Sequence, residues 1–277
     1  MIAILLATYN SEKYIVEQID SILSQGYKDW ILFAHDDGST DNTVSIIDKY
    51  VSLFPEKIKF SKNKLIGLGA YKSFLSLLEE VDSDYYMFCD HDDVWLSFKL
   101  DISMKRMWEM ESLYPLKPIV VHSDMKVVDQ NLNVISNSFW SYSKYLPNHV
   151  CFEELVCCNC VNGCTMLFNR AAKNVSKGNE KYCLMHDTYI SQSVASSGGI
   201  ITAIVEPTVL YRQHLENVIG AANRNKLFFL KRGFIQPLDS IKVNYKVWKR
   251  VKKMHNLSFF RFLYFKLKII ILRYFKR

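Results

Sequence analysis

The stretch YYMFCDHDDVW, Tyr85 to Trp95, places Asp90, His91, Asp92 and Asp93 directly behind an apolar run. The apolar run is typical of a buried strand, so the acidic residues should lie where that strand ends. Carboxylates this close repel one another, and burying them is costly unless something positive compensates them. The candidates are a metal ion, a neighbouring basic side chain and the N-terminus of a helix.

Strand and helix signals alternate through the chain around this stretch. The first half has the order of a β-α-β-α-β-α-β unit, which predicts an α/β fold with a doubly wound, mostly parallel sheet of the nucleotide-binding, Rossmann-like type. The middle of the chain is less periodic. We expect strands at 2–7, 30–35, 57–61, 85–89, 119–124, 162–170 and 200–214, and helices between the early strands and at 96–110 and 187–195.

Composition favours a folded cytoplasmic protein. The 277 residues are 49% hydrophobic and 23% charged, which is enough apolar material for a sizeable core. Seven cysteines without a regular framework indicate reduced thiols. The N-terminal apolar run has no basic region before it and no cleavage site, so we expect a strand and no signal peptide. No apolar stretch reaches about 18 residues, so no membrane-spanning helix is expected.

Charge is distributed unevenly along the chain. Residues 1–224 carry 20 Lys and Arg against 27 acids, whereas residues 225–277 carry 15 Lys and Arg and one acid, Asp239. This predicts a catalytic domain at 1–224 and a basic, aromatic, helical tail at 225–277. Aromatic and aliphatic residues mixed with cations favour an anionic membrane surface as partner over nucleic acid, for which there is no motif. For 225–250, packing on the body remains an alternative.

Three polar clusters follow predicted strands: ATYNSE (7–12), DDGSTD (36–41) and DHDD (90–93). In parallel α/β sheets, ligands bind at such strand ends. Asp41 suits the N-cap of the next helix and Asp93 the cap of a helix starting near Val94. Asp36 and Asp37 could instead bind a pyrimidine base or a ribose hydroxyl. Asp90 and Asp92 could both face a hard cation such as Mg²⁺ or Mn²⁺, which would bridge a diphosphate.

The segments ATYNSEKYI, DDGSTDNT and CDHDDVW, at these separations, resemble the family-2 glycosyltransferases, whose fold is the A-type nucleotide-diphospho-sugar fold. The likeness runs over about residues 1–220. NGCTMLFNR (162–170), MHDTYI (185–190) and YRQHLENVIG (211–220) resemble a rhamnosyltransferase-like subgroup that assembles O-antigen or capsule. The motif of processive synthases is absent, which favours transfer of a single sugar.

The resemblance implies a role for each matching residue. Asp37 with Asp36 would contact the base, Thr8 and Tyr9 would line the nucleotide pocket, and Asp90 and Asp92 would form the DxD metal motif, with Asp92 the direct ligand. Asp187 would be the catalytic base, although an aspartate at a helix start is more often a cap. Gly163 and Cys164 would face the acceptor, with His186 beside Asp187. His214 would bind phosphate or metal, or be a strand-end histidine.

The resulting prediction is an inverting, metal-dependent transferase. It would move one sugar from dTDP-rhamnose or a UDP-sugar to a lipid-linked oligosaccharide, as a peripheral protein on the cytoplasmic face of the plasma membrane. The alternatives are a sugar nucleotidyltransferase, which usually opens with a glycine-rich loop that ATYNSEKYI lacks, and a non-catalytic membrane-surface binding protein. The cysteines at 157–164 lack the paired spacing of a zinc site, so apolar packing is favoured.

Overall fold

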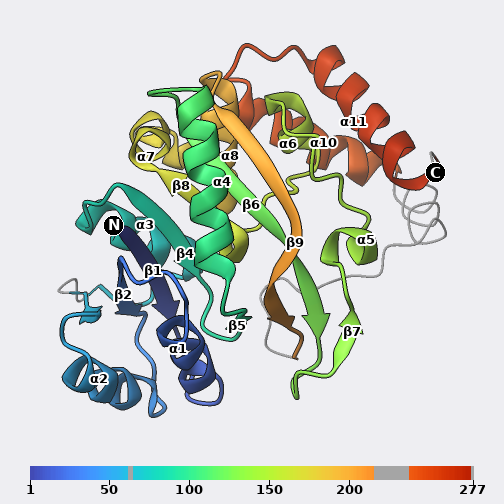
Figure 1. Ribbon diagram of the computed structural model, residues 1–277. Helices are drawn as coiled ribbons and strands as arrows, with labels where there is room; N and C mark the ends of the chain where they lie inside the picture. The colour runs from blue at the N-terminus through green and yellow to red at the C-terminus, as the bar shows by residue number, and fades with distance from the viewer. Residues whose placement is uncertain (62–64, 215–236, 276–277) are drawn as a thin grey trace.

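Four parallel strands form one half of a single mixed sheet in the computed structural model, which describes residues 1–61, 65–214 and 237–275 (Figure 1). Each strand is a continuous or nearly continuous apolar run, as a parallel strand covered on both faces requires. Their order is β3-β2-β1-β4. The strands are β1 (Ile2–Thr8), β2 (Trp30–Asp36), β3 (Ile58–Phe60) and β4 (Tyr85–Cys89).

The other half of the sheet continues from β4 through β8, β6 and β9 to β5. β8 runs antiparallel to both β4 and β6, while β6 and β9 are parallel and long. The segment 200–214, expected to form one or two strands, is one strand with register shifts against β6. These strands are β5 (Val94–Trp95), β6 (Ile119–Val128), β7 (Val134–Ser136), β8 (Leu167–Asn169) and β9 (Ile200–Arg212).

Helices cover both faces of the sheet, which confirms the doubly wound α/β prediction. Along β1, Ile2, Ile4 and Leu6 pack with α1, α2 and α4, whereas Ala3 and Leu5 pack with α3, α7 and α8. This alternation is the two-residue period of a strand buried on both sides. The helices are α1 (Ile15–Leu23), α2 (Thr43–Leu53), α3 (Ala70–Glu80), α4 (Lys99–Leu113), α7 (Arg170–Ser176) and α8 (His186–Ser196).

Two local predictions are wrong. Val94 and Trp95 form strand β5, paired with β9, and the next helix begins only at Lys99. Asp93 therefore caps no helix. The segment 162–170 was expected to be a strand that ends in a turn. It contains a strand, β8, but the turn, η1 (Gly163–Thr165), comes before this strand, and α7 follows it. Shorter elements complete the body: α5 (Phe139–Ser143), α6 (Phe152–Cys157) and η2 (Glu180–Tyr182).

The part of the basic tail that the structure describes is two helices packed on α6, α10 (Pro237–Val251) and α11 (Phe259–Tyr274). In Figure 1 both lie at one edge of the molecule, beyond α6. Phe262 and Ile269 of α11 share an apolar cluster with Phe152 and Cys157 of α6. Residues 225–236, and with them the predicted boundary at 224, lie outside the described residues. None of the helices in the described ranges is long and apolar enough to cross a membrane.

Candidate active site

The three predicted polar loops meet at the carboxyl ends of β1, β2 and β4. In the sheet register Thr8 pairs with Asp36, and Leu6 pairs with Cys89, so the loops that follow start side by side. Thr8 Oγ1 donates to Asp36 Oδ1 at 2.9 Å. Tyr9, the next residue, is 56% exposed and therefore open to a ligand at this edge. The sheet brings together what the sequence only suggested.

Asp36 and Asp37 both hold loop backbone. Asp36 Oδ2 accepts the N–H of Ser39 at 2.8 Å and of Gly38 at 3.1 Å, and Gly38 has the positive φ that this turn needs. The Asp37 carboxylate accepts the N–H groups of Leu68 and Gly69, both at 2.7 Å. Asp37 therefore ties the loop before α3 to the carboxyl end of β2. Each carboxylate has further lone pairs through which it could also bind a ligand.

Asp41 partly fulfils its predicted capping role. Helix α2 starts at Thr43, and Asn42 is its N-cap residue without a side-chain capping bond. Asp41 Oδ1 accepts the Thr43 N–H at 3.0 Å, so the carboxylate satisfies a donor of the first turn from one residue further out. The same carboxylate accepts the Glu12 N–H at 3.1 Å, which joins the first two loops.

The acidic loop after β4 finds its partners far away in the sequence. Asp92 Oδ2 lies 2.8 Å from His214 Nε2, and the two side chains are only 13% and 7% exposed. Asp93 is completely buried, and its Oδ1 accepts the backbone N–H of Arg212 at 3.1 Å. Its Oδ2 has no hydrogen-bond partner among the described residues. The loop is thus fastened to the end of β9.

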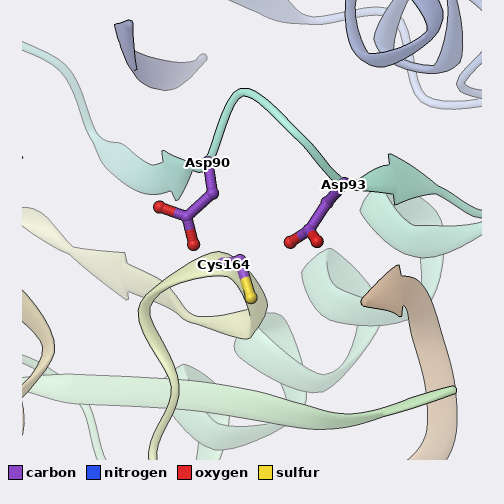
Figure 2. A group of neighbouring side chains, drawn as sticks. All are labelled: Asp90, Asp93 and Cys164. Carbon is purple, nitrogen blue, oxygen red and sulfur yellow. The ribbon is translucent and has the colours of Figure 1, made fainter. Parts of the chain in front are cut away.

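Asp90, Asp93 and Cys164 form a compact group whose potential ligand atoms all lie within 4.8 Å of one another. Figure 2 shows both carboxyl groups directed toward the η1 turn that carries Cys164. The donor chemistry fits a hard divalent cation through carboxylate oxygens, because Mg²⁺ and Mn²⁺ prefer oxygen ligands. Burial raises the pKa of the Cys164 thiol well above its ordinary value, so the sulfur is protonated and suits such an ion poorly.

Asp187 is brought to the same site from 97 residues further along the chain than Asp90. Burial, Asp92 and Asp187 raise the pKa of Asp90 to about 7. Burial also raises the pKa of Asp187 to about 7. Because Asp187 perturbs Asp90, the two carboxyl groups share one environment at the start of α8 and the end of β4. Two buried carboxyl groups with raised pKa values near the end of a sheet strand are typical of a catalytic site.

Two buried cations beneath this site were not predicted. Lys99 Nζ donates to the carbonyl of Cys164 at 2.9 Å, and burial lowers its pKa to about 8. The Arg212 guanidinium is 2% exposed; it donates to the carbonyls of Asp92 at 2.7 Å and Gln130 at 2.8 Å, and it pairs with Glu17. For Arg212, the only indication in the sequence was a single cation that follows apolar residues in a predicted strand.

The three residues predicted on the acceptor side lie inside the protein. Gly163 and Cys164 are buried in η1, and the His186 imidazole packs between Phe74 and Phe88, with ring centroids 4.2 and 4.7 Å away. Burial lowers the pKa of His186 to about 3, so the ring is neutral. His186 therefore lies beside Asp187 in the sequence but serves as a core side chain.

A mixed sheet of this topology, with acidic loops gathered at its parallel strand ends, has the arrangement expected of the A-type fold. The family model for glycosyl transferase family 2 matches residues 3–174, well over half of the chain. The protein belongs to glycosyl transferase family 2, and it is a glycosyltransferase. Membership in this family also supports a nucleotide-sugar donor.

Two similar proteins are sugar transferases by name. The chain is 28% identical to a dTDP-rhamnosyl transferase, RfbG, of Shigella flexneri over 83% of this chain and 79% of that protein. It is 26% identical to a UDP-Glc:alpha-D-GlcNAc-diphosphoundecaprenol beta-1,3-glucosyltransferase, WfgD, of Escherichia coli over 63% of this chain and 62% of that one.

The fold matches that of S. aureus TarS. A structure of TarS residues 1–349 in complex with UDP-GlcNAc superposes with a TM-score of 0.63 at 18% identity, over 98% of this chain and 72% of that one. Over the longer TarS chain, the match covers 42%. At this identity the likeness establishes the A-type fold and says nothing of the substrate.

Proposed function

We propose that the protein transfers one sugar, with inversion, from a nucleotide-diphospho-sugar to a lipid-linked glycan during surface-polysaccharide assembly. The observation that carries this proposal is the placement of Asp187, with a pKa raised to about 7, in one environment with the acidic loop at Asp90. The printed activities of RfbG and WfgD support dTDP-rhamnose or a UDP-sugar as donor, and that of WfgD supports a diphosphoundecaprenol-linked acceptor.

The donor would bind along the ends of β1 and β2. Thr8 and the exposed ring of Tyr9 would line the nucleotide pocket, and Asp37 with Asp36 would contact the base or ribose. Support comes from the hydrogen bonds that already order both carboxylates, because a pre-organised acceptor loses little entropy on binding. Asp37 would then also link donor binding to the loop at Leu68.

Asp90 and Asp92 would hold Mn²⁺ or Mg²⁺, with His214 orienting Asp92 or serving as a further ligand. A divalent ion there would neutralise charge on the departing diphosphate. The chain's own contribution is the acidic loop, in which Asp90 lies in a compact group with Asp93 and Cys164 while Asp92 contacts His214. Burial, and after it the charges of Asp92 and Asp187, raise the pKa of Asp90, and the buried Asp93 Oδ2 has no hydrogen-bond partner among the described residues. A bound cation would offset the repulsion and supply the missing contact, which supports a cation here.

Asp187 would accept the proton from the attacking acceptor hydroxyl. Inversion requires this base to lie across the reacting carbon from the leaving diphosphate, and a pKa near 7 suits a group that must be ionised before it takes a proton. The 162–164 loop and His186 would act on the acceptor side by shaping this region, since Cys164 and His186 are buried.

The enzyme would work as a peripheral protein on the cytoplasmic face of the plasma membrane, with the segment from 225 onward as a membrane-associating unit. A lipid-linked acceptor requires such a location. The strongly basic composition of residues 225–277 supports an anionic lipid surface as the partner.

A donor screen tests the proposal. The protein is incubated with dTDP-rhamnose and a panel of UDP-sugars, with and without Mn²⁺ or Mg²⁺, and both thermal unfolding and donor consumption are followed. A true donor should raise the melting temperature by mass action, by an amount that depends on its concentration. Stabilisation and consumption with one donor, dependent on the metal, are expected; no effect of any nucleotide sugar contradicts the proposal.

A further inference from the structure

We propose that the outward faces of α10 and α11 form one anionic-lipid docking surface, in which α11 supplies the apolar contact and α10 the charge. This inference rests on the membrane location within the proposed function and assigns it to particular residues. Both helices pack on the apolar cluster that includes Phe152, Val251 and Phe262, so their opposite faces point away from the body (Figure 1).

The cations of α11 are committed to the body. Lys266 Nζ donates to the Cys157 carbonyl at 3.1 Å, and Lys268 pairs with Glu154 at 2.7 Å. The remaining two behave alike: Arg261 pairs with Glu153 at 2.7 Å, and Arg273 donates to the Ser143 carbonyl at 2.7 Å. These four cations therefore hold the helix against the body.

The outer face of α11 is apolar and uncovered. Phe260 is 84% exposed, Tyr264 64% and Leu267 59%, and the same row continues through Ile271 and Phe275. The spacing of three and four residues places these side chains along one stripe of the helix. Exposing so many large apolar side chains in one contiguous row marks an interaction surface.

The outer face of α10 carries a row of lysines. Lys242, Lys246 and Lys249 are exposed and spaced by four and three residues, and Lys253 extends the row beyond the helix end. No ion pair joins these lysines to an acid among the described residues, and residues 225–277 contain a single acid, Asp239. The row is therefore a positive charge that no acid among the described residues neutralises.

Charge complementarity favours lipid over a second copy of the chain. Anionic headgroups match a row of lysines that no acid neutralises within the described ranges, and the boundary between headgroups and acyl chains accommodates exposed Phe, Tyr and Leu side chains. A twofold contact through the same face would instead bring two lysine rows toward each other, at an electrostatic cost. The surface is thus an interfacial anchor that lies on the membrane.

Vesicle co-sedimentation tests the assignment. The full chain is mixed with phosphatidylglycerol–phosphatidylcholine vesicles or with pure phosphatidylcholine vesicles. The Lys246→Gln/Lys249→Gln variant should bind the anionic vesicles about 25-fold more weakly, at about fivefold per lysine. Phe260→Ser and Leu267→Ser should each weaken binding about tenfold. Lys105→Gln and Leu113→Ser, exposed positions on α4, are the matched controls and should bind as the unmodified protein does.

Retained binding by both the lysine and the apolar variants, with the unmodified protein bound, would place the anchor elsewhere and overturn the inference. The inference also fails if light scattering shows a dimer of the unmodified protein that Leu267→Ser converts to a monomer. Transfer to a water-soluble acceptor analogue, measured in parallel, reports the proposed reaction separately: its absence contradicts the transferase proposal, while vesicle binding alone decides the docking surface.

Discussion

Replacing Gly163 with alanine should destabilise the protein and lower its rate of sugar transfer, because the new methyl group would clash with a buried side chain that has little room to move. A Cβ at Gly163 would lie 2.1 Å from His186 Nε2 and 2.8 Å from its Cδ2. Ordinary contact requires well over 3 Å, so something must shift by more than 1 Å. The imidazole packs against both Phe74 and Phe88, whose rings also contact each other, and this restricts its rotation.

Whether Gly163→Ala raises or lowers the stability of the protein distinguishes a clash from its absence. Gly163 is not among the glycines with positive φ, so Gly163→Ala without a clash would stabilise by about 0.4–1 kcal/mol through the unfolded chain. Overpacking instead costs about 1–3 kcal/mol. For a chain of this size that is a fall in melting temperature of about 2–4 °C per kcal/mol. Relief by moving the start of α8 would also displace Asp187, so the transfer rate should fall.

Differential scanning calorimetry and initial-rate assays measure both effects. Gly26→Ala is the matched control: its Cβ would meet the Asp101 carboxylate, which is the end of an exposed side chain and can turn aside. Combining Gly163→Ala with His186→Ala should cost less than the sum of the two single changes, because the methyl group then fills vacated space. An alanine variant at 163 as stable and as active as the original protein would refute the reasoning.

Three further predictions concern the acidic loop and the base. Asp92→Ala should reduce metal-dependent transfer at least about a hundredfold while the circular dichroism spectrum stays unchanged, with Asp48→Ala as control; full activity would exclude Asp92 from the site. Arg212→Lys should lower stability by about 2–5 kcal/mol in thermal unfolding, because one ammonium cannot serve the Asp92 and Gln130 carbonyls together with Glu17; an unchanged melting temperature would contradict this. The transfer rate should rise with pH through about 7, since Asp187 must be ionised to act as base. The stability contributed by Asp187 should fall as pH rises from about 4 to about 7, because its pKa is higher in the folded than in the unfolded protein. Asp187→Asn should therefore melt higher than the original protein at about pH 8.

The parallel half of the sheet was predictable because its strands depend on local pattern. The apolar runs that begin at Ile2, Trp30 and Tyr85 form parallel strands that require only that both of their faces be covered. Because these strands are parallel, their carboxyl ends meet at one edge of the sheet. The polar residues that follow, from Thr8, Asp36 and Asp90, therefore gathered at one edge as expected. The charge of Asp187 acts on Asp90, although no periodicity placed α8 near β4, and its role as the base stays a prediction.

The partners of the acidic loop were unpredictable for the opposite reason. Local statistics favour Asp93 as a helix cap, but the backbone N–H of Arg212, far away in the sequence, takes that carboxylate instead. Tertiary pairing with β9 turns Val94 and Trp95 into a strand. Lys99 carries no sequence signal for burial, and the position of Arg212 in a predicted strand does not reveal its partners, since only the folded neighbours satisfy the charge.

Helix α11 of the tail shows the same limit of prediction from local sequence. The periodicity of 259–274 identifies an amphipathic helix, but it cannot say which side faces the body. The acids Glu153 and Glu154 of α6 decide it by pairing with Arg261 and Lys268. The cations of this helix thus contact groups of the body, and the apolar row faces outward.

The central claim is that Asp187 is the base of a nucleotide-sugar transfer, and single-turnover measurements on Asp187→Asn test it most directly. With the donor identified by the screen, in the presence of Mn²⁺, the variant should keep the donor-dependent rise in melting temperature. It should lose sugar transfer by about a hundredfold to ten-thousandfold, the contribution typical of a general base. Transfer at the rate of the original protein, or loss of donor binding together with activity, would contradict the assignment.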